Sequence, residues 1–194
     1  MAVSDSYSAG QRRAAVSGAS SGTVAEARGN RTLQRNRGSG LRKAVTSVEI
    51  RRVETNKKQY LALLLLADEQ EDMIDRYLER GSMYVLEDDG VKAECVVTDE
   101  GGGVLELKNI AVEPDFQGKG YGKALVDFLI RTYAGQYMLL QVGTGDSPST
   151  IPFYESCGFC RHHLVKNFFT DHYDHPIYEC GVKLVDMVYL QREL

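Results

Sequence analysis

Residues 110–123 read Ile-Ala-Val-Glu-Pro-Asp-Phe-Gln-Gly-Lys-Gly-Tyr-Gly-Lys, and this stretch decides the fold. Three glycines, at 118, 120 and 122, separate an apolar run typical of a buried strand from a pattern typical of an amphipathic helix. Glycine lets the main chain approach an anion closely, and the amides of a first helical turn favour negative charge. Lys119 and Lys123 add positive charge. The stretch therefore predicts a strand, loop and helix that hold a phosphate or pyrophosphate.

Two common phosphate-binding loops do not fit this stretch. A Walker loop ends in Gly-Lys-Ser/Thr, and Gly122 and Lys123 are followed by Ala124, which lacks the hydroxyl that contacts magnesium. A dinucleotide fingerprint spaces its glycines as Gly-x-Gly-x-x-Gly in a first βαβ unit, whereas these glycines alternate and lie past the middle of the chain.

Hydrophobic periodicity and turn residues predict the elements around this unit. Thr55 is expected to cap a first helix, and Asp68 with Glu71 to form a capping-box variant at the start of a second. Asp89-Gly90 predicts a hairpin. Strands are expected at 48–53, 82–87, 91–97, 104–112, 137–142, 159–165 and 182–190, and helices at 55–67, 68–81 and 150–157, with a further helix from the glycine loop to about residue 133. This order predicts an α/β (α+β) chain with a single mixed, mostly antiparallel sheet and helices on both faces.

Composition places the chain among ordinary globular proteins. It has 194 residues, of which 43% are hydrophobic and 26% charged, and its longest apolar run, 61–67, is too short to span a membrane. Four cysteines are too few for a disulfide scaffold, so we expect reduced thiols and a cytoplasmic protein. The composition favours neither a membrane nor a nucleic acid as partner.

Residues 1–45 differ from the rest of the chain. Residues 1–43 carry eight basic and two acidic residues, are rich in Ser, Gly and Ala, and show no sustained period. Such a segment cannot bury enough apolar surface to offset its ordering entropy, so we expect a disordered basic tail before a domain at 46–194. Three interpretations are open: an inert extension or upstream start site, an organellar transit peptide, and an arm that binds nucleic acid.

The segment Gln117-Gly118-Lys119-Gly120-Tyr121-Gly122 resembles the acyl-CoA signature Gln/Arg-x-x-Gly-x-Gly/Ala of the GNAT superfamily of N-acetyltransferases. Phe153-Tyr154-Glu155-Ser156-Cys157-Gly158-Phe159 resembles the family's Phe-Tyr-x-x-x-Gly-Phe element. The resemblance covers about residues 46–194 and implies the GNAT fold, with acetyl-CoA as cosubstrate, no metal, and a primary amine as acceptor.

The resemblance also implies which residues bind acetyl-CoA. Main-chain groups of the strand at Ile110, Ala111 and Val112 would hold the pantetheine arm and polarise the thioester carbonyl. The loop would hold the pyrophosphate through Gln117, Gly118, Lys119, Gly120, Tyr121, Gly122 and Lys123. In many family members an asparagine near the start of the helix expected at 150–157 contacts the cofactor; this chain has Thr144 to Ser149 there.

Two residues are candidates for proton transfer. Glu106 lies four residues before Ile110, where several GNAT enzymes carry a general base; the alternatives are a water relay and a solvated strand glutamate. Tyr154 matches the family's general acid, which protonates the leaving thiolate; the alternative is an aromatic side chain that packs on the sheet.

Rival interpretations remain open. Cys157 and Cys160, followed by four histidines and Cys180, could bind zinc, but Cys157 precedes a helix stop and the flanking strand turns His162 and His163 to opposite faces. Cys157 could also carry the acyl group. The whole domain could be a non-catalytic acyl-CoA-binding or regulatory module.

The acceptor is constrained by charge. The segment 167–181 is long for a connection and rich in aromatic and acidic residues, so we expect a loop that recognises a cationic amine of a small molecule or peptide. The last strand, with Tyr189-Leu190-Gln191, is expected at a sheet edge that could form a homodimer.

Overall fold

The computed structural model describes residues 48–194. The expected basic tail, together with the first two residues of the expected domain, lies outside the described residues. Within 48–194, no helix is long and apolar enough to cross a membrane.

A seven-stranded mixed sheet forms the centre of the domain. Its strand order is β1-β2-β3-β4-β5-β9-β6; β4 and β5 are parallel and all other neighbours are antiparallel. The strands are β1 (Glu49–Val53), β2 (Ser82–Glu87), β3 (Val91–Asp99), β4 (Val104–Val112), β5 (Leu139–Gly145), β6 (Cys160–Val165) and β9 (Met187–Glu193). The mixed, mostly antiparallel sheet predicted from sequence is confirmed.

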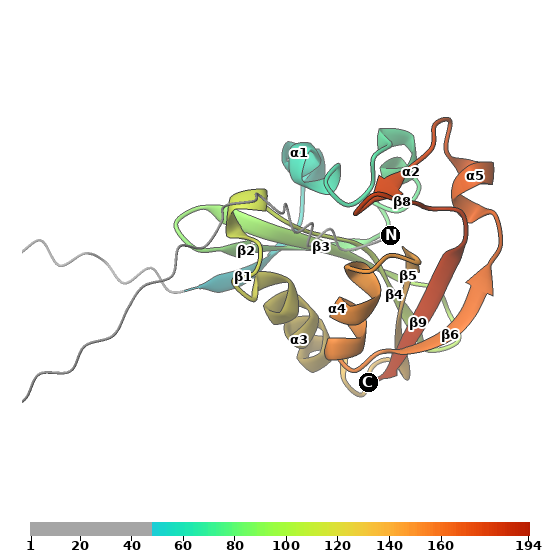
Figure 1. Cartoon of the computed structure of the whole chain (residues 1–194). Coiled ribbons are helices and arrows are strands. Elements are labelled where there is room, and N and C mark those ends of the chain that lie inside the picture. The colour runs from blue at the N-terminus through green and yellow to red at the C-terminus, as the bar shows by residue number, and fades with distance from the viewer. Residues whose placement is uncertain (1–47) are drawn as a thin grey trace, which may run out of the picture. The chain divides into compact units, whose positions relative to one another are not determined.

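Helices cover both faces of the sheet, as expected (Figure 1). One face carries the 3-10 helix η1 (Lys57–Tyr60), α1 (Leu61–Leu64) and α2 (Glu71–Asp75); the other carries η2 (Pro114–Phe116), α3 (Tyr121–Tyr133) and α4 (Thr150–Ser156). Under α3 and α4 lies the largest apolar cluster, built on residues such as Leu107, Leu125 and Leu140. A second cluster, with Leu64, Ile74 and Leu78, lies under α1 and α2.

The helices before β2 differ from the prediction. Instead of one helix from Thr55, a short 3-10 turn begins after Asn56, whose φ is +52°. The expected capping box is wrong as well, because Gln70 stands at the N-cap of α2 and no side chain caps it. Asp68 turns inward instead and accepts hydrogen bonds from two buried tyrosines.

The segment 167–181, expected as a loop, contains secondary structure. It holds α5 (Phe168–His172) and β7 (Tyr178–Glu179), which pairs with β8 (Val182–Lys183) in a separate ribbon. Phe169, Tyr173 and Ile177 are buried against Met73 in a third apolar cluster. Aromatic residues that were interpreted as recognition groups therefore mostly hold the segment to the domain.

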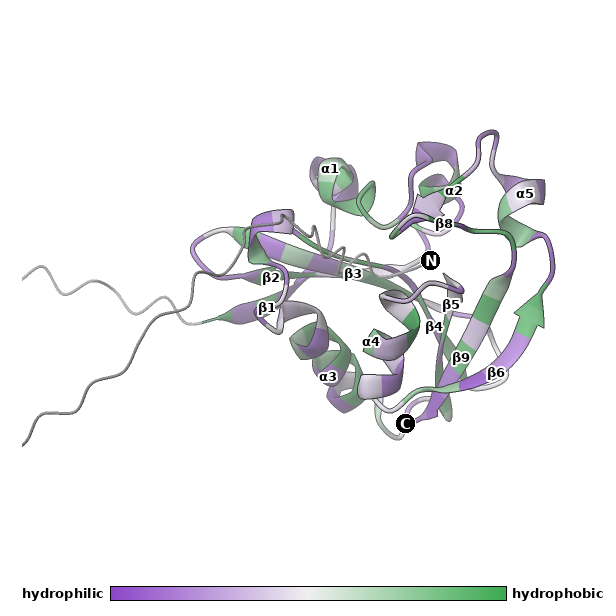
Figure 2. Ribbon diagram, viewed as in Figure 1, coloured by the Kyte–Doolittle hydropathy of each residue, from purple (hydrophilic) through white to green (hydrophobic). Residues whose placement is uncertain are grey.

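The expectation that the last strand forms an edge is wrong. β9 pairs with β5 on one side and with β6 on the other, so β1 and β6 are the edges of the sheet. Most residues of β6 are exposed, and the strand is largely purple in Figure 2.

Candidate functional site

The alternating glycines line a hollow of about 200 Å³, which we call the glycine hollow. Gly118 and Gly120 have φ of +71° and +86°, in the left-handed region that favours glycine, and a Cβ at either would meet no atom within 4 Å. At Gly122 packing is tight, because a Cβ there would lie 3.3 Å from the Phe153 ring. The hollow is lined by Val112, Phe116, Gly118, Gly120, Tyr121, Gly122, Lys123, Phe153 and Ser156.

The glycine hollow fits a pyrophosphate. Open space beside two glycines lies at the first turn of the 13-residue helix α3, whose free amides and dipole favour an anion. Lys123 lines the hollow, 3.6 Å from Asp127. Lys119 does not line it: its Nζ donates to the Asp115 carbonyl and lies 4.2 Å from the centre of the Phe116 ring.

Two side chains of the motif hold the loop in place. The amide of Gln117 donates to the carbonyl of Val112 at 3.2 Å, which ties the loop to the end of β4. The hydroxyl of Tyr121 donates to Asp88 in the β2–β3 hairpin. These predicted cofactor residues therefore position the hollow, and Tyr121 also lines it.

β4 leaves part of its main chain unpaired on one side. The β4–β5 ladder ends at Leu107 and Val142, although β4 continues to Val112 and β5 to Gly145. The strands therefore separate at the end of β4 that lies next to the glycine hollow.

The pairing of β4 with β3 shows where these main-chain groups point. The amide of Glu113 donates to the Lys92 carbonyl, and an antiparallel ladder alternates between bonded and non-bonded pairs. The main-chain groups of Ile110 and Val112 therefore point away from β3, toward the unpaired side, whereas those of Ala111 point to β3. This geometry fits an extended ligand that lies along Ile110 and Val112 and carries amide groups of its own.

A second pocket, of about 250 Å³, lies where β4, β5 and β9 meet α2 and α5. We call it the charged pocket, because it holds both carboxylates and cations. It is lined by Asp68, Met73, Arg76, Tyr77, Arg80, Glu106, Lys108, Gly143, Phe168, His172, Met187 and Tyr189.

Glu106 lies in this pocket and is almost fully buried, with 5% of its surface exposed. Both of its oxygens already accept hydrogen bonds, one from Lys108 Nζ at 2.7 Å and the other from Gln141 Nε2 at 2.6 Å. Lys108 also lies 3.3 Å from Glu100, which in turn pairs with Arg80. Glu106 therefore belongs to a connected set of charges that includes Lys108, Glu100 and Arg80.

A bulge in β4 brings polar side chains to one face. Glu106 pairs with Thr98 and Asn109 with Val96, so the register shifts by one residue at Lys108. In a regular strand, residues three apart point to opposite faces, but this shift lets Glu106 and Asn109 share the face under α1 and α2.

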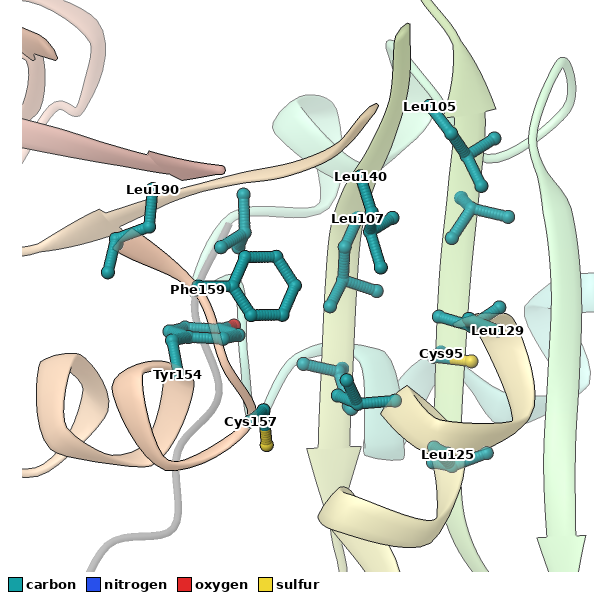
Figure 3. Packing of buried hydrophobic residues seen from close by; sticks show 14 of the residues in the cluster. Cys95, Leu105, Leu107, Leu125, Leu129, Leu140, Tyr154, Cys157, Phe159 and Leu190 are labelled. Atoms are coloured by element: carbon teal, nitrogen blue, oxygen red, sulfur yellow. The ribbon is translucent and has the colours of Figure 1, made fainter. Parts of the chain in front are cut away.

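Tyr154 lies outside both hollows. It is fully buried and packs edge-on against Phe153 and Phe159, with ring centroids 5.2 and 5.6 Å away. Figure 3 shows Tyr154 and Cys157 projecting from α4 into the apolar cluster. The structure therefore does not bring Tyr154 and Glu106 into one pocket, although Phe153, the neighbour of Tyr154, lines the glycine hollow.

The cysteines and histidines are spread over the C-terminal half. Cys157 is buried and Cys160 exposed, while His162 and His163 face each other with their Nδ1 atoms 2.8 Å apart. Among residues 48–194, no group of three or more His, Cys, Asp or Glu side chains could hold a metal ion. Burial raises the pKa of the Cys157 thiol, which disfavours the reactive thiolate.

Sequence reasoning missed much of the charged pocket. The sequence predicted Asp68 as part of a capping box and His172 as part of a rival metal cluster, and it indicated no role for Arg76. Their meeting depends on α5 packing beside α2 across about 100 residues of chain, as in the Tyr173–Asp68 hydrogen bond. No local pattern encodes that contact.

Comparison with known proteins agrees with this geometry. Residues 79–161 match the Acetyltransferase (GNAT) domain. The chain is 38% identical to the uncharacterized N-acetyltransferase YvbK of Bacillus subtilis (strain 168) over 144 residues, 73% of this chain and 92% of that protein.

Solved structures give the same result. An IAA acetyltransferase from Bacillus cereus ATCC 14579 superposes with a TM-score of 0.71 and 38% identity, over 76% of this chain and 100% of that one. A GNAT family acetyltransferase from Elizabethkingia anophelis with acetyl-CoA bound gives 0.72 and 33%, over 76% and 98%. A Bacillus subtilis acetyltransferase in complex with CoA gives 0.70 and 34%, over 76% and 99%.

Proposed function

Because the chain belongs to the GNAT family of acetyltransferases, we propose that it transfers the acetyl group of acetyl-CoA to a primary amine of a small molecule or peptide, by direct attack in a ternary complex. The relatives with bound acetyl-CoA and CoA support the donor. The charged pocket, with Asp68 and Glu106 among its lining residues, supports an acceptor that enters as an ammonium cation.

One observation carries this proposal: a single strand runs from one hollow to the other. Glu106 and Lys108 of β4 line the charged pocket, and Val112 lines the glycine hollow. Six residues of strand span about 20 Å, a length comparable to that of an extended pantetheine arm. A pyrophosphate in the glycine hollow would therefore direct its thioester along β4 toward the charged pocket.

Main-chain and side-chain groups of this chain would act on both acetyl-CoA and the acceptor amine. The amides at the start of α3 and Lys123 would bind the pyrophosphate, and the main chain of Ile110 and Val112 would align the arm and polarise the thioester carbonyl. Tyr154 would give its proton to the departing thiolate, because it lies in the same apolar cluster as Ile110 of β4 and Val142 of β5, where the two strands separate. The buried Cys157, with its raised pKa, supports direct attack over an acyl-cysteine.

A turnover assay tests the proposal. Free thiol released from acetyl-CoA would be measured with polyamines, aminoglycosides, amino acids and peptides as acceptors. We expect turnover on one amine class, and acetylated amine in equal amount by mass spectrometry. Tight acetyl-CoA binding without turnover on any amine would overturn the proposal.

Tyr154→Phe tests the general acid within the same assay. We expect kcat to fall by about 100-fold, the usual size of a general-acid contribution, while acetyl-CoA affinity measured by calorimetry stays unchanged. Phe159→Leu is the matched control for lost packing, since Phe159 packs edge-on against the same ring. An equal loss of kcat in both variants would assign Tyr154 to packing alone.

A further inference from the structure

An amine that arrives as an ammonium must lose a proton before it attacks, and the proton acceptor has to lie in the pocket that receives it. Glu106 meets the second condition, but its carboxylate is already paired with a cation, the ammonium of Lys108 at 2.7 Å, and Gln141 donates to its other oxygen. The charged pocket has one other lining carboxylate, Asp68.

Resting on the function proposed above, we infer that Asp68 is a catalytic residue of this acetyltransferase: it binds the ammonium of the acceptor and removes its proton. Asp68 follows α1 and lines the charged pocket, although only 1% of its surface is exposed. A carboxylate in such surroundings attracts an ammonium more strongly than a solvated one.

Three hydroxyl and amide groups hold the Asp68 carboxylate in a defined direction. The hydroxyl of Tyr173 donates to Oδ1 at 3.2 Å and that of Tyr77 to Oδ2 at 3.4 Å. Asn109 Nδ2 donates to the Tyr77 oxygen at 2.8 Å, so the Tyr77 proton is left to point at Asp68. A chain of donors thus runs from β4, next to Ile110, to the carboxylate.

The surroundings also suit proton uptake. Burial raises the pKa of the Asp68 carboxyl above its ordinary value, and hydrogen bonds from Tyr173, the Gln70 backbone and Tyr77 oppose this rise. A carboxylate with a raised pKa accepts a proton more readily near neutral pH. The other titratable or charged groups around it, from the residues after α2 and from α5, β3, β4 and β9, are Arg76, Arg80, His172, Glu94, Glu106, Lys108 and Tyr189.

The proton and bond balance is complete. The ammonium gives one proton to Asp68, and the neutral amine attacks the thioester carbonyl. A carbon–nitrogen bond forms and the carbon–sulfur bond breaks. The second amine proton reaches the thiolate, in exchange with the Tyr154 proton, and Asp68 releases its own proton to solvent. The products are the acetamide, CoA thiol and one proton.

The pH dependence of kcat/KM for the acceptor, at saturating acetyl-CoA, tests the inference with the full-length protein. In wild type, kcat/KM is expected to fall at low pH as Asp68 is protonated, a feature that we call the acidic limb. This fall comes in addition to the rise with pH that the amine's own pKa causes. Asp68→Asn should lower kcat/KM at pH 7 by about 100-fold or more and abolish the acidic limb. Glu106→Gln and His172→Asn should keep the limb, whatever they do to the rate.

Tyr173→Phe separates proton transfer from a structural role. Loss of its hydrogen bond to the charged carboxylate raises the pKa of Asp68, so the acidic limb should move to higher pH while the enzyme stays active. This variant also carries the test if Asp68→Asn does not fold, which thermal melting and calorimetry with acetyl-CoA would reveal.

The outcomes are distinct. Two results would overturn the role of Asp68 and leave the acetyltransferase proposal intact. In the first, Asp68→Asn and Tyr173→Phe both turn over with an unchanged acidic limb. In the second, the limb is lost only in Glu106→Gln or His172→Asn. Absence of turnover in wild type on every amine would overturn both.

Discussion

The glycine hollow and the charged pocket lie at the two ends of one strand and are built in opposite ways. The hollow is formed by main chain: nearly all its lining comes from residues 112–123, and two glycines in left-handed conformation open it. The pocket is formed by side chains from α2, β4, β5, α5 and β9, which meet only in the folded chain. Recognition by main chain therefore depends on a short local motif, whereas the acceptor site depends on the whole fold.

The largest effect is expected from a substitution in the glycine hollow. Gly120→Glu places a carboxylate, in a strained left-handed conformation, where the pyrophosphate would lie. Repulsion of about 3 kcal/mol should weaken acetyl-CoA binding by about 100-fold or more. Isothermal calorimetry measures the change.

Gly101→Glu is the matched control for this substitution. Gly101 also has a positive φ, of +78°, and open space beside it, but it lies in the β3–β4 turn. The Gly101→Glu variant should lose stability without losing affinity for acetyl-CoA. An equal loss of affinity in both variants would show that strain, and not the anion site, is responsible.

The difference between the glycine hollow and the charged pocket also explains which features the sequence could predict. The Asp89-Gly90 hairpin, the limits of β2 and β4 and the end of α3 follow from local chemistry and are confirmed. The capping role of Asp68 is wrong, because two tyrosines, one of them 105 residues away, provide donors that a cap would not. Likewise, β9 looked like an edge because nothing in its sequence reveals that β6 returns beside it.

A second prediction concerns the ion pair between Lys108 and Glu106 in the charged pocket. Lys108→Met removes a cation from Glu106, whose side chain is only 7% exposed, and leaves a buried carboxylate without its ion pair. The free energy of unfolding should fall by about 2 to 3 kcal/mol in urea titrations. Glu106→Gln combined with Lys108→Met should recover part of that loss, because no buried charge remains. Additive losses in the double variant would rule out the coupling between the two side chains.

A third prediction sharpens the pocket's selectivity. Among the described residues, Arg80 is paired with Glu100, whereas no hydrogen bond or ion pair of the Arg76 side chain is found, so Arg76 presents its guanidinium to the pocket. A free guanidinium favours an acceptor that carries a carboxylate over a matched diamine. Arg76→Gln should shift the ratio of kcat/KM between these two acceptors by about tenfold toward the diamine.

The exposed Arg131 on α3 provides the control for Arg76. Arg131→Gln removes the same charge away from the pocket and should leave the ratio unchanged. Equal shifts in the two variants would mean that the overall field of the protein, and not Arg76, selects the acceptor.

The last prediction concerns a second buried carboxyl, and it separates proton chemistry from burial alone. Glu94 of β3 is fully buried on the same sheet face as Asn109, but it does not line the charged pocket. Burial raises its pKa well above the ordinary value, so the folded chain holds a proton that the unfolded chain releases above a pH of about 4.3. The contribution of Glu94 to stability is therefore present at low pH and declines as pH rises, by up to about 1.4 kcal/mol for each pH unit, until the folded-state pKa is passed. Glu94→Gln, which cannot ionise, should gain stability relative to wild type between pH 5 and pH 8 in urea titrations while its acidic kcat/KM limb stays in place. A limb that moved with Glu94→Gln would mean that the buried carboxyls titrate as one group, and that Asp68 does not act on the acceptor alone.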